Sequence, residues 1–426
     1  MLSAEDNELL TRIGPGTPMG ALLRRFWMPA LLEEEVPVPD GDPVRLRLLG
    51  EDLVAFRNTE GRVGILDAYC PHRQAHLFFG RNEECGLRCV YHGWKFDIDG
   101  HCVDMPSEPP ANDFQRKVRI ASYPTEIRGG VVWVYMGPAD SRPELPAFEW
   151  SCLPADRVAA TKRLQQCNWA QALEGGVDSS HISLLHSNLA DAGEGNFGRP
   201  RDSYNKTDSH PVFHVKQTDY GMLIGARRDG EADSYYWRIT QCLMPFYTMI
   251  PPQMEGADTA RSPYGGHAWV PIDDGNCWTW SFGVHPHRAF TAEEYAITAS
   301  PTGRWGPIDA NYRPLQNRDN DYLIDREDQR TRSYTGIAGV PNQDAGIQES
   351  MGPICDRTKE HLGASDIAVI EWRKRILGMA KDLAAGKAPT EPHRGDWYNV
   401  RPASLLLDRD VEFEAGAANL LAGTTI

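Results

Sequence analysis

The sequence lacks any long apolar run and any signal-like start. Its longest apolar segment, "VVWVYM" at 131–136, is far shorter than the roughly 20 residues that a membrane-spanning helix needs. The first ten residues, "MLSAEDNELL", are acidic and have neither the basic start nor the apolar core of a secretory signal. These absences predict a protein without a signal peptide that does not bind or cross a membrane.

Basic residues and paired cysteines are also scarce. The chain has 44 Lys and Arg against 59 Asp and Glu, a formal net charge of −15, which argues against nucleic acid or an anionic membrane as partner. Nine cysteines are an odd number, and they are spread along the chain without paired spacing. This pattern is typical of reduced thiols, some of them recruited as ligands, and it predicts a cytoplasmic protein.

The 426 residues are too many for one ordinary core, so we expect separate domains. Residues 1–40 are helical and then Pro-rich, and we expect them to pack on a catalytic domain. Residues 41–145 show short alternating segments divided by turns, as in a small antiparallel domain. Residues 158–426 mix strand patterns with helices, including a long one at about 365–385. The fold class is therefore predicted to be α+β.

The segment 70–94, "CPHRQAHLFFGRNEECGLRCVYHGW", carries two mixed cysteine and histidine pairs. Cys70-x-His72 is followed after sixteen residues by Cys89-x-x-His92. Structural zinc sites of two Cys and two His usually keep the cysteines together and the histidines together. Mixed pairs instead favour a Rieske [2Fe–2S] cluster, in which one iron takes both thiolates and the other both imidazoles.

A second metal site is predicted in "NWAQALEGGVDSSHISLLHS", 168–187, which we interpret as a helix weakened by glycines and serines. Asp178 and His181 are three residues apart and would share one helix face. His181 and His186 are five apart, about 140° round an ideal helix, so the helix must loosen or end for both to bind one metal. Two histidines and a carboxylate form the facial triad of non-haem Fe(II) oxygenases.

The carboxylate ligand has to come from farther along the chain. The acid-rich run at 317–330 is typical of a solvated helix face. "NQDAGIQES" instead places Asp344 among less polar residues at helical spacing, which suits a buried ligand. We predict Asp344 as the third ligand, with Glu349 and Asp356 as alternatives.

These residues together resemble the Rieske non-haem iron oxygenases, specifically the large subunit of aromatic ring hydroxylases. The resemblance covers essentially the whole chain. The opening "NELLTRIGPGTPMGALLRRFWMPAL" and the late "NRDNDYLIDRE", "SYTGI", "QDAGIQESMGPI" and "DRTKEHLG" are similar to the phthalate 4,5-dioxygenase group. This implies an N-terminal all-β Rieske domain followed by a catalytic domain with a helix-covered antiparallel sheet. It also implies homotrimers or hexamers of stacked trimers, fed by an NADH-dependent flavin and iron–sulfur reductase.

The resemblance also implies roles for individual residues. Asp178 matches the carboxylate that links an iron-ligand histidine, here His181, to the second Rieske histidine, here His92, of a neighbouring subunit. One departure is Gln343, because many relatives, especially O-demethylases, have an acidic residue just before the third ligand. The remaining matches are the cluster ligands Cys70, His72, Cys89 and His92 and the iron ligands His181, His186 and Asp344.

We expect the chain to be the oxygenase component of a system that dihydroxylates an aromatic carboxylate such as phthalate, isophthalate, a halobenzoate or a phenoxybenzoate. Arg238 and the pair Arg227–Arg228 are weak candidates for binding the carboxylate through a guanidinium fork. One alternative is a monooxygenase or O-demethylase that uses the same iron sites. The others are a Rieske electron carrier with no activity of its own and a zinc-stabilised interaction protein.

Overall fold

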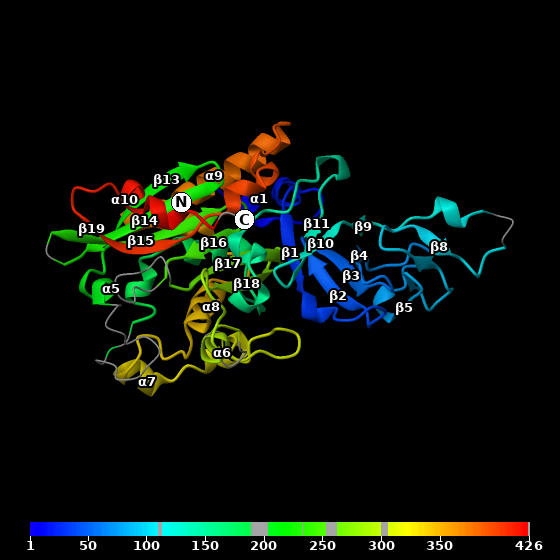
Figure 1. The fold of residues 1–426 in the computed structure, drawn as a ribbon, viewed down its shortest axis with the longest axis horizontal. Coiled ribbons are helices and arrows are strands. Elements are labelled where there is room, and N and C mark those ends of the chain that lie inside the picture. The colour runs from blue at the N-terminus through cyan, green and yellow to red at the C-terminus, as the bar shows by residue number, and fades with distance from the viewer. Residues whose placement is uncertain are drawn as a thin grey trace.

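The computed structural model describes residues 1–109, 113–187, 189, 203–231, 233–252, 262–299 and 306–424, with the backbone alone at 203, 206 and 297–299. Figure 1 shows an elongated molecule with small sheets at one end and a large sheet with most of the helices at the other. No helix within those ranges is long and apolar enough to cross a membrane. The α+β class is confirmed.

The small end is built from the alternating segments that the sequence predicted as strands. Leu46 and Leu48 are buried and alternate with outward-facing residues along their strand, as the two-residue side-chain period of a strand requires. These strands form two antiparallel sheets, one in the order β2-β3-β4-β9 and the other in the order β5-β6-β7-β8. Their strands are β2 Val44–Leu48, β3 Glu51–Arg57, β4 Val63–Asp67, β9 Ser122–Tyr123, β5 Arg81–Glu83, β6 Gly86–Arg88, β7 Lys95–Phe96 and β8 Cys102–Asp104.

The N-terminal segment joins the two ends of the molecule. Helices α1 Ala4–Thr11 and α2 Pro18–Leu23 pack on the long helix α9 Ile367–Ala384. The next residues, in the segment predicted to be helical and then Pro-rich, form strand β1 Trp27–Leu32. All six residues of this strand are buried, and one of them is Pro29. The sequence therefore lacks the alternation of apolar and polar residues that marks a half-buried strand. It pairs with β11 Val131–Tyr135, which also pairs with β10 Thr125–Arg128.

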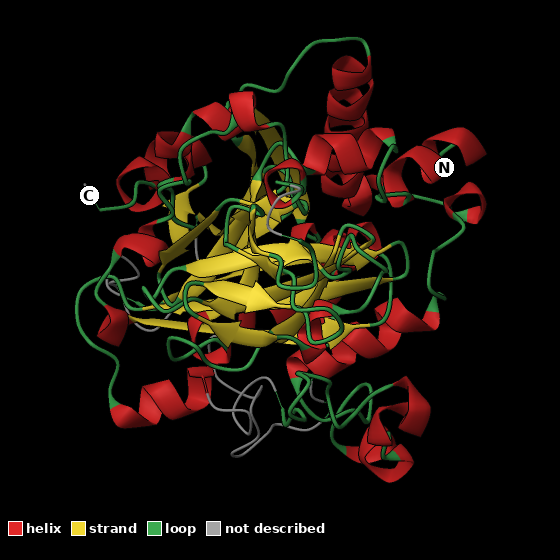
Figure 2. Ribbon diagram, turned by 90° about the vertical axis from the view of Figure 1, so that its right-hand side faces the viewer, coloured by secondary structure: helices red, strands yellow, loops and turns green. Residues whose placement is uncertain are grey.

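The large end is an antiparallel sheet of eight strands in the order β12-β18-β17-β16-β15-β14-β13, with β19 also paired to β15. Strands β14 and β15 form an antiparallel pair, with Gly230 directly after β14. Figure 2 shows the strands at the centre with helices around them. The strands are β12 Val158–Gln165, β13 Val212–Thr218, β14 Gly221–Asp229, β15 Ser234–Leu243, β16 Tyr247–Ile250, β17 Tyr264–Asp273, β18 Asn276–Val284 and β19 Ala403–Asp408.

The helices near this sheet begin and end at sequence signals. The predicted long helix is confirmed as α9. Just before its first turn, the Asp366 carboxylate accepts from the Gly363 amide at 2.7 Å. Just after its last turn comes Gly386, which has a φ of 89°. The other helices are α3 Glu149–Cys152, α4 Trp169–Val177, α5 Ser203–Thr207, α6 Ala292–Ala299, α7 Arg326–Thr331, α8 Val340–Ser350 and α10 Phe413–Leu421.

Candidate metal centres

The two Cys–His loops follow strands β4 and β6 and meet at the small end of the molecule. The second loop turns tightly, because the Gly93 amide donates to the Cys89 carbonyl at 2.9 Å and Gly93 itself has a φ of 80°. The Cys70 thiol lies within hydrogen-bonding reach of Cys89. The ring centroids of His72 and His92 are 4.4 Å apart. All four residues predicted for the cluster therefore come together.

The surroundings of these side chains suit bound metal. Burial, together with the neighbouring Cys89, raises the pKa of the Cys70 thiol to about 12, so a pair of thiolates here needs cations to balance its charge. The buried Nδ1 of His72 has no hydrogen-bond partner among the residues that the structure describes, which leaves its lone pair for a metal. The Trp94 indole stacks on the His72 ring, with ring centroids 4.4 Å apart and planes at 9°, and fixes its plane.

The spacing of the four residues favours a dinuclear cluster over a single zinc. A tetrahedral zinc holds four ligand atoms at about 2.0–2.3 Å from one point, so they would crowd together. In the described ranges, the only compact group of three or more metal-binding side chains is a different one, in the large domain. Two irons held apart by bridging sulfides need this wider arrangement of thiolates and imidazoles.

Helix α4 ends at Val177, ahead of both histidines of the second site, so the predicted helix through residue 187 is wrong. Asp178 already has extended dihedral angles, and its carboxylate accepts from the Ser180 amide at 2.6 Å. Such local bonds compete with the helical ladder. His181 then begins a single 3₁₀ turn, η7 His181–Ser183. Asp178 and His181 therefore meet across a loop rather than along one helix face.

His181, His186 and Asp344 converge, with one ligand atom of each within 4.8 Å of the others. The Asp344 carboxylate lies 3.3 Å from Nε2 of His186 and 3.6 Å from Nε2 of His181. Burial raises the pKa of Asp344, but the two imidazoles outweigh it and lower the pKa below its ordinary value. The result is an ionised carboxylate beside two imidazole nitrogens on one side of a common point, which suits a facial Fe(II) site.

Each histidine of this group is held by its other ring nitrogen. Nδ1 of His181 lies 3.2 Å from the Asp178 carboxylate, and Nδ1 of His186 lies 2.7 Å from Oε1 of Gln343. Burial lowers the pKa of His181, but Asp178 and Asp344 outweigh it and raise the pKa overall. In the sequence, Gln343 stands out only as a departure from relatives, because its contact with His186 joins two segments that are far apart in the chain.

Two arginines on neighbouring strands lie beside this group. Arg228 on β14 is 1% exposed, and it donates to the Ser179 carbonyl at 2.7 Å and to Ser183 Oγ at 3.3 Å, so it holds the loop that carries His181. Arg228 pairs in register with Tyr236 of β15.

Arg238, two residues after Tyr236 on β15, lies on the same face of the sheet as Arg228. Its Nε is buried without a hydrogen-bond partner in the described part of the chain. Arg238 is near enough to His181 and Arg228 for its charge to act on their pKa values. The structure therefore leaves a partly buried cation, with an unpaired Nε–H, beside the predicted iron site.

The other sequence candidates lie elsewhere. The Glu349 carboxylate accepts from the Gln166 amide at 2.9 Å, and the Asp356 carboxylate caps the next turn by accepting from Thr358. Neither belongs to the compact group. The Arg227 guanidinium stacks on Tyr235, 4.2 Å from the ring centroid.

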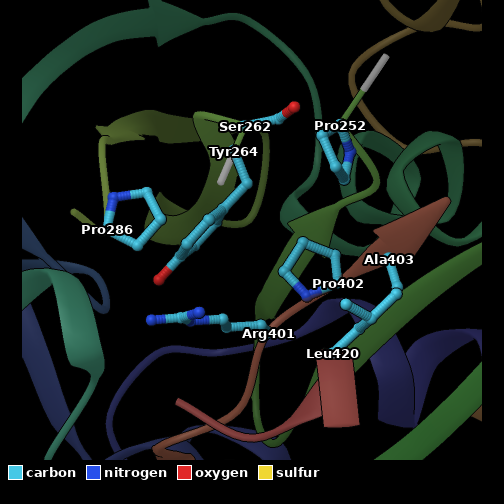
Figure 3. Close-up of a pocket in the computed structure, with 8 residues that line it drawn as sticks. All are labelled: Pro252, Ser262, Tyr264, Pro286, Arg401, Pro402, Ala403 and Leu420. Carbon is cyan, nitrogen blue, oxygen red and sulfur yellow. The ribbon is translucent and has the colours of Figure 1, made fainter. Parts of the chain in front are cut away.

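A pocket elsewhere in the large domain contains none of these residues. Figure 3 shows the Tyr264 hydroxyl and the Arg401 guanidinium facing each other across it. Arg401 is already paired with the buried Glu149. Its charge is therefore balanced within the chain, and the pocket is a poor receptor for an anionic substrate.

Comparison with known families matches both halves of this arrangement. The Rieske [2Fe-2S] domain family matches residues 26–124, and the family described as LigXa C-terminal domain like matches residues 134–394. Among solved structures, dicamba monooxygenase bound to dicamba has a similar fold, with a TM-score of 0.58 and 16% identity over 85% of this chain and 99% of that one.

Two curated relatives are similar along most of their length. The phthalate 4,5-dioxygenase oxygenase subunit of Pseudomonas putida is 42% identical, over 91% of this chain and 88% of that protein. The 3-chlorobenzoate-3,4-dioxygenase oxygenase subunit of Comamonas testosteroni is 39% identical over 99% of both chains.

The chain belongs to the Rieske non-haem iron oxygenases. Within them it falls with the oxygenase subunits that include phthalate 4,5-dioxygenase, as the sequence resemblance predicted. It is an enzyme, the oxygenase component of a multicomponent system, with a Rieske cluster and a mononuclear iron as cofactors. It uses O₂ and an organic substrate and depends on a separate reductase. The hypotheses of an electron carrier and of a zinc-stabilised interaction protein are thereby set aside.

Proposed function

We propose that the protein dihydroxylates an aromatic carboxylate such as phthalate, isophthalate, a halobenzoate or a phenoxybenzoate. The observation that carries this proposal is Arg238, a cation with a buried, unpartnered Nε beside the predicted iron site. An unsatisfied buried N–H on a charged group is costly, and a bidentate carboxylate would satisfy it and balance the charge. Both relatives, a phthalate and a chlorobenzoate dioxygenase subunit, support the same substrate class.

In this proposal Cys70, His72, Cys89 and His92 hold the cluster, and His181, His186 and Asp344 hold the iron. The bound groups supply single-electron transfer and O₂ activation, respectively. The overall reaction joins one arene, O₂, NADH and a proton to give a cis-dihydrodiol and NAD⁺, with NADH acting through the reductase. Arg238 binds the carboxylate and sets which ring edge faces the iron, while Arg228 keeps the His181 loop in place.

We further propose that electrons cross between subunits of a homotrimer or of a hexamer of stacked trimers. In Figure 1, β5 and β8 beside the cluster loops lie at one end of the long axis, and α8, which carries Asp344, lies toward the other. Val90 and Tyr91 in the second cluster loop are 57% and 53% exposed, as residues that dock on another subunit would be. Asp178 would then bridge His181 to a neighbour's His92. A monomeric mass in solution would contradict this arrangement.

The remaining parts of the proposal concern the reductase, the location and the domain limits. We propose a flavin and iron–sulfur reductase as the partner. A cytoplasmic location is supported by the nine cysteines, all of which lie in described ranges and none of which forms a disulfide.

We place the Rieske domain at 41–145 and the catalytic domain at 158–426, with 1–40 packed on the latter through α1 and α2.

Arg238→Met tests the substrate class, with Arg227→Met as the matched control. The purified oxygenase and a reductase are assayed with a panel of benzoates, phthalates and uncharged aromatics, and NADH use is compared with product. We expect wild type to couple best to a carboxylated ring. Loss of a charged hydrogen bond in Arg238→Met should raise KM for that acid by about 10–100-fold, and Arg227→Met should leave it unchanged. Equal effects of both changes, or coupling only to uncharged aromatics, would refute the proposal.

The alternative is a monooxygenase or O-demethylase on the same iron sites. The fold does not decide between them, because dicamba monooxygenase shares it. Turnover under ¹⁸O₂ does: two labelled atoms in one product support dihydroxylation, and one labelled atom supports the alternative.

A further inference from the structure

The side-chain amide of Gln343 is held in one orientation by its own surroundings. Gln343 is 3% exposed, and its Nε2 donates to the Ile337 carbonyl at 2.9 Å. A carbonyl oxygen only accepts, so the amide nitrogen has to lie on that side. Ile337 is itself buried in a small cluster with Tyr322 and Ala345, and its amide donates to Thr335 Oγ1 at 3.1 Å, so the acceptor is fixed too.

The fixed amide determines which nitrogen of His186 carries the proton. Oε1 of Gln343 has to face His186, and it lies 2.7 Å from Nδ1. Because an amide oxygen only accepts, Nδ1 has to donate, and the neutral ring then keeps its lone pair on Nε2. That nitrogen faces the Asp344 carboxylate, 3.3 Å away. Gln343 and Asp344 are adjacent in α8, so one helical turn supplies both an iron ligand and the partner that orients another.

The two histidines of the site therefore have partners of different charge. His181 is held by a carboxylate, Asp178, whereas His186 is held by a neutral amide. A carboxylate partner makes an imidazole a stronger electron donor than an amide partner does. Of the two described groups that hold the Nδ1 atoms, Asp178 carries a charge and Gln343 does not.

We infer that Gln343 is a positioning residue of the iron site, which holds His186 as the Nδ1–H tautomer by a neutral hydrogen bond and so sets the metal affinity of the site. The inference rests on the proposed ligands His181, His186 and Asp344.

Cobalt(II) binding to protein that has lost its mononuclear iron but kept its cluster tests this inference. Gln343→Met keeps the side-chain length but removes the acceptor, and we expect about 10–100-fold weaker Co²⁺ binding. The matched control is Gln348→Met, because Gln348 is also an amide on α8, bonded to Gln165 at 2.6 Å rather than to a histidine. This control should bind Co²⁺ like wild type, and the visible absorption of the cluster should be the same in all variants.

Proton NMR of the Co²⁺ form gives a readout that a purely structural role would not change. Compared with the same protein before Co²⁺ is added, wild type should gain two shifted, exchangeable imidazole N–H signals, one from His181 and one from His186. Gln343→Met should lose one of them, whereas Gln343→Glu, which keeps an acceptor at this position, should retain both. The inference would be overturned if Gln343→Met bound Co²⁺ with wild-type affinity and kept both signals. It would also be overturned if wild type showed only one of these signals, and this second test does not depend on whether a variant folds.

His186→Ala distinguishes failure of the inference from failure of the proposed function. If Co²⁺ binding is insensitive to His186→Ala, the proposed iron site is wrong and the inference fails with it. If binding needs His186 but is unchanged in Gln343→Met, only the inference fails.

Discussion

At the scale of single residues, the position of Asp344 in its helix explains why it, rather than Glu349, faces the histidines. Five residues along a helix correspond to about 500° of rotation, so the two carboxylates lie about 140° apart round α8. Glu349 turns toward the start of α4 and accepts from the Gln166 amide at 2.9 Å. Asp344 turns toward both imidazoles, and its contacts with them, led by a hydrogen bond with His186, lower its pKa against the effect of burial.

Asp344→Ala should therefore remove one iron and leave the cluster. We expect wild type to hold about three irons and two acid-labile sulfides per chain. Asp344→Ala should hold about two irons with the cluster absorption unchanged, because only the mononuclear site loses a ligand. Asp356→Ala, which changes an exposed capping carboxylate, should keep all three. Metal analysis of the purified proteins checks this, and full iron content in Asp344→Ala would exclude Asp344 as a ligand.

At the scale of elements, two consecutive glycines let α4 approach both the sheet and α8. A Cβ on Gly176 would lie 2.2 Å from Cη2 of Trp269, a rigid ring on β17. A Cβ on Gly175 would lie 2.3 Å from Nε2 of Gln348, the movable end of a long side chain. The glycines that weaken the helical pattern in the sequence thus place the end of α4, and the Asp178 loop after it, against the iron site.

Gly176→Ala should accordingly be the most disruptive of three helical Gly→Ala changes. Overpacking against Trp269 should cost about 1–3 kcal/mol of folding free energy and lower iron occupancy by moving the Asp178 loop. Gly175→Ala should cost less, because the Gln348 side chain can move. Gly378→Ala in α9 meets no atom within 4 Å and should stabilise by up to about 1 kcal/mol. Urea unfolding ranks the three, and equal midpoints would contradict the packing argument.

At the scale of the whole molecule, the buried carboxylate of Glu149 ties the segment after the small sheets to the far end of the chain. It accepts from Arg401 Nε at 2.6 Å, from the Thr424 amide at 2.9 Å and from the Tyr264 hydroxyl. Burial alone raises the pKa of Glu149, but these donors outweigh it and hold the pKa at about 2. Three distant segments thus share one anion.

This network predicts a defined pH dependence of stability. Because the folded pKa of Glu149 lies below the ordinary 4.5, the unfolded chain binds the extra proton, and its contribution is complete above pH 4.5 and lost as the pH falls toward 2. Glu149→Gln should lower the free energy of unfolding by at most about 3 kcal/mol at pH 7, with the deficit shrinking below pH 4.5. Urea midpoints of wild type and variant between pH 7 and 3 measure this difference.

Glu294→Gln is the control for this pH dependence. Its pKa is also lowered to about 2, through Arg288, but this pair is solvent-exposed, so its loss should cost under about 1 kcal/mol. Equal effects of the two changes would mean that burial does not strengthen the Glu149 network.

Much of this protein was determined by sequence alone, because its chemistry depends on residue types at short spacings. Cys70, His72, Cys89 and His92 lie in two short loops, so their pairing and the predicted cluster follow from the sequence. The strand pattern of the small sheets and the limits of α9 follow in the same way, from the alternation of Leu46 and Leu48 and from the cap at Asp366.

Only the tertiary structure decided the surroundings of the iron site, because they are contacts between segments far apart in the chain. The bond between His186 and Gln343 spans 157 positions, and the bond between Arg228 and the Ser179 carbonyl spans 49. The close approach of α4 to the sheet was also decided there, since Gly176 has to fit against Trp269. Local patterns specify which residues can bind a metal, whereas packing between distant elements specifies how each ligand is held.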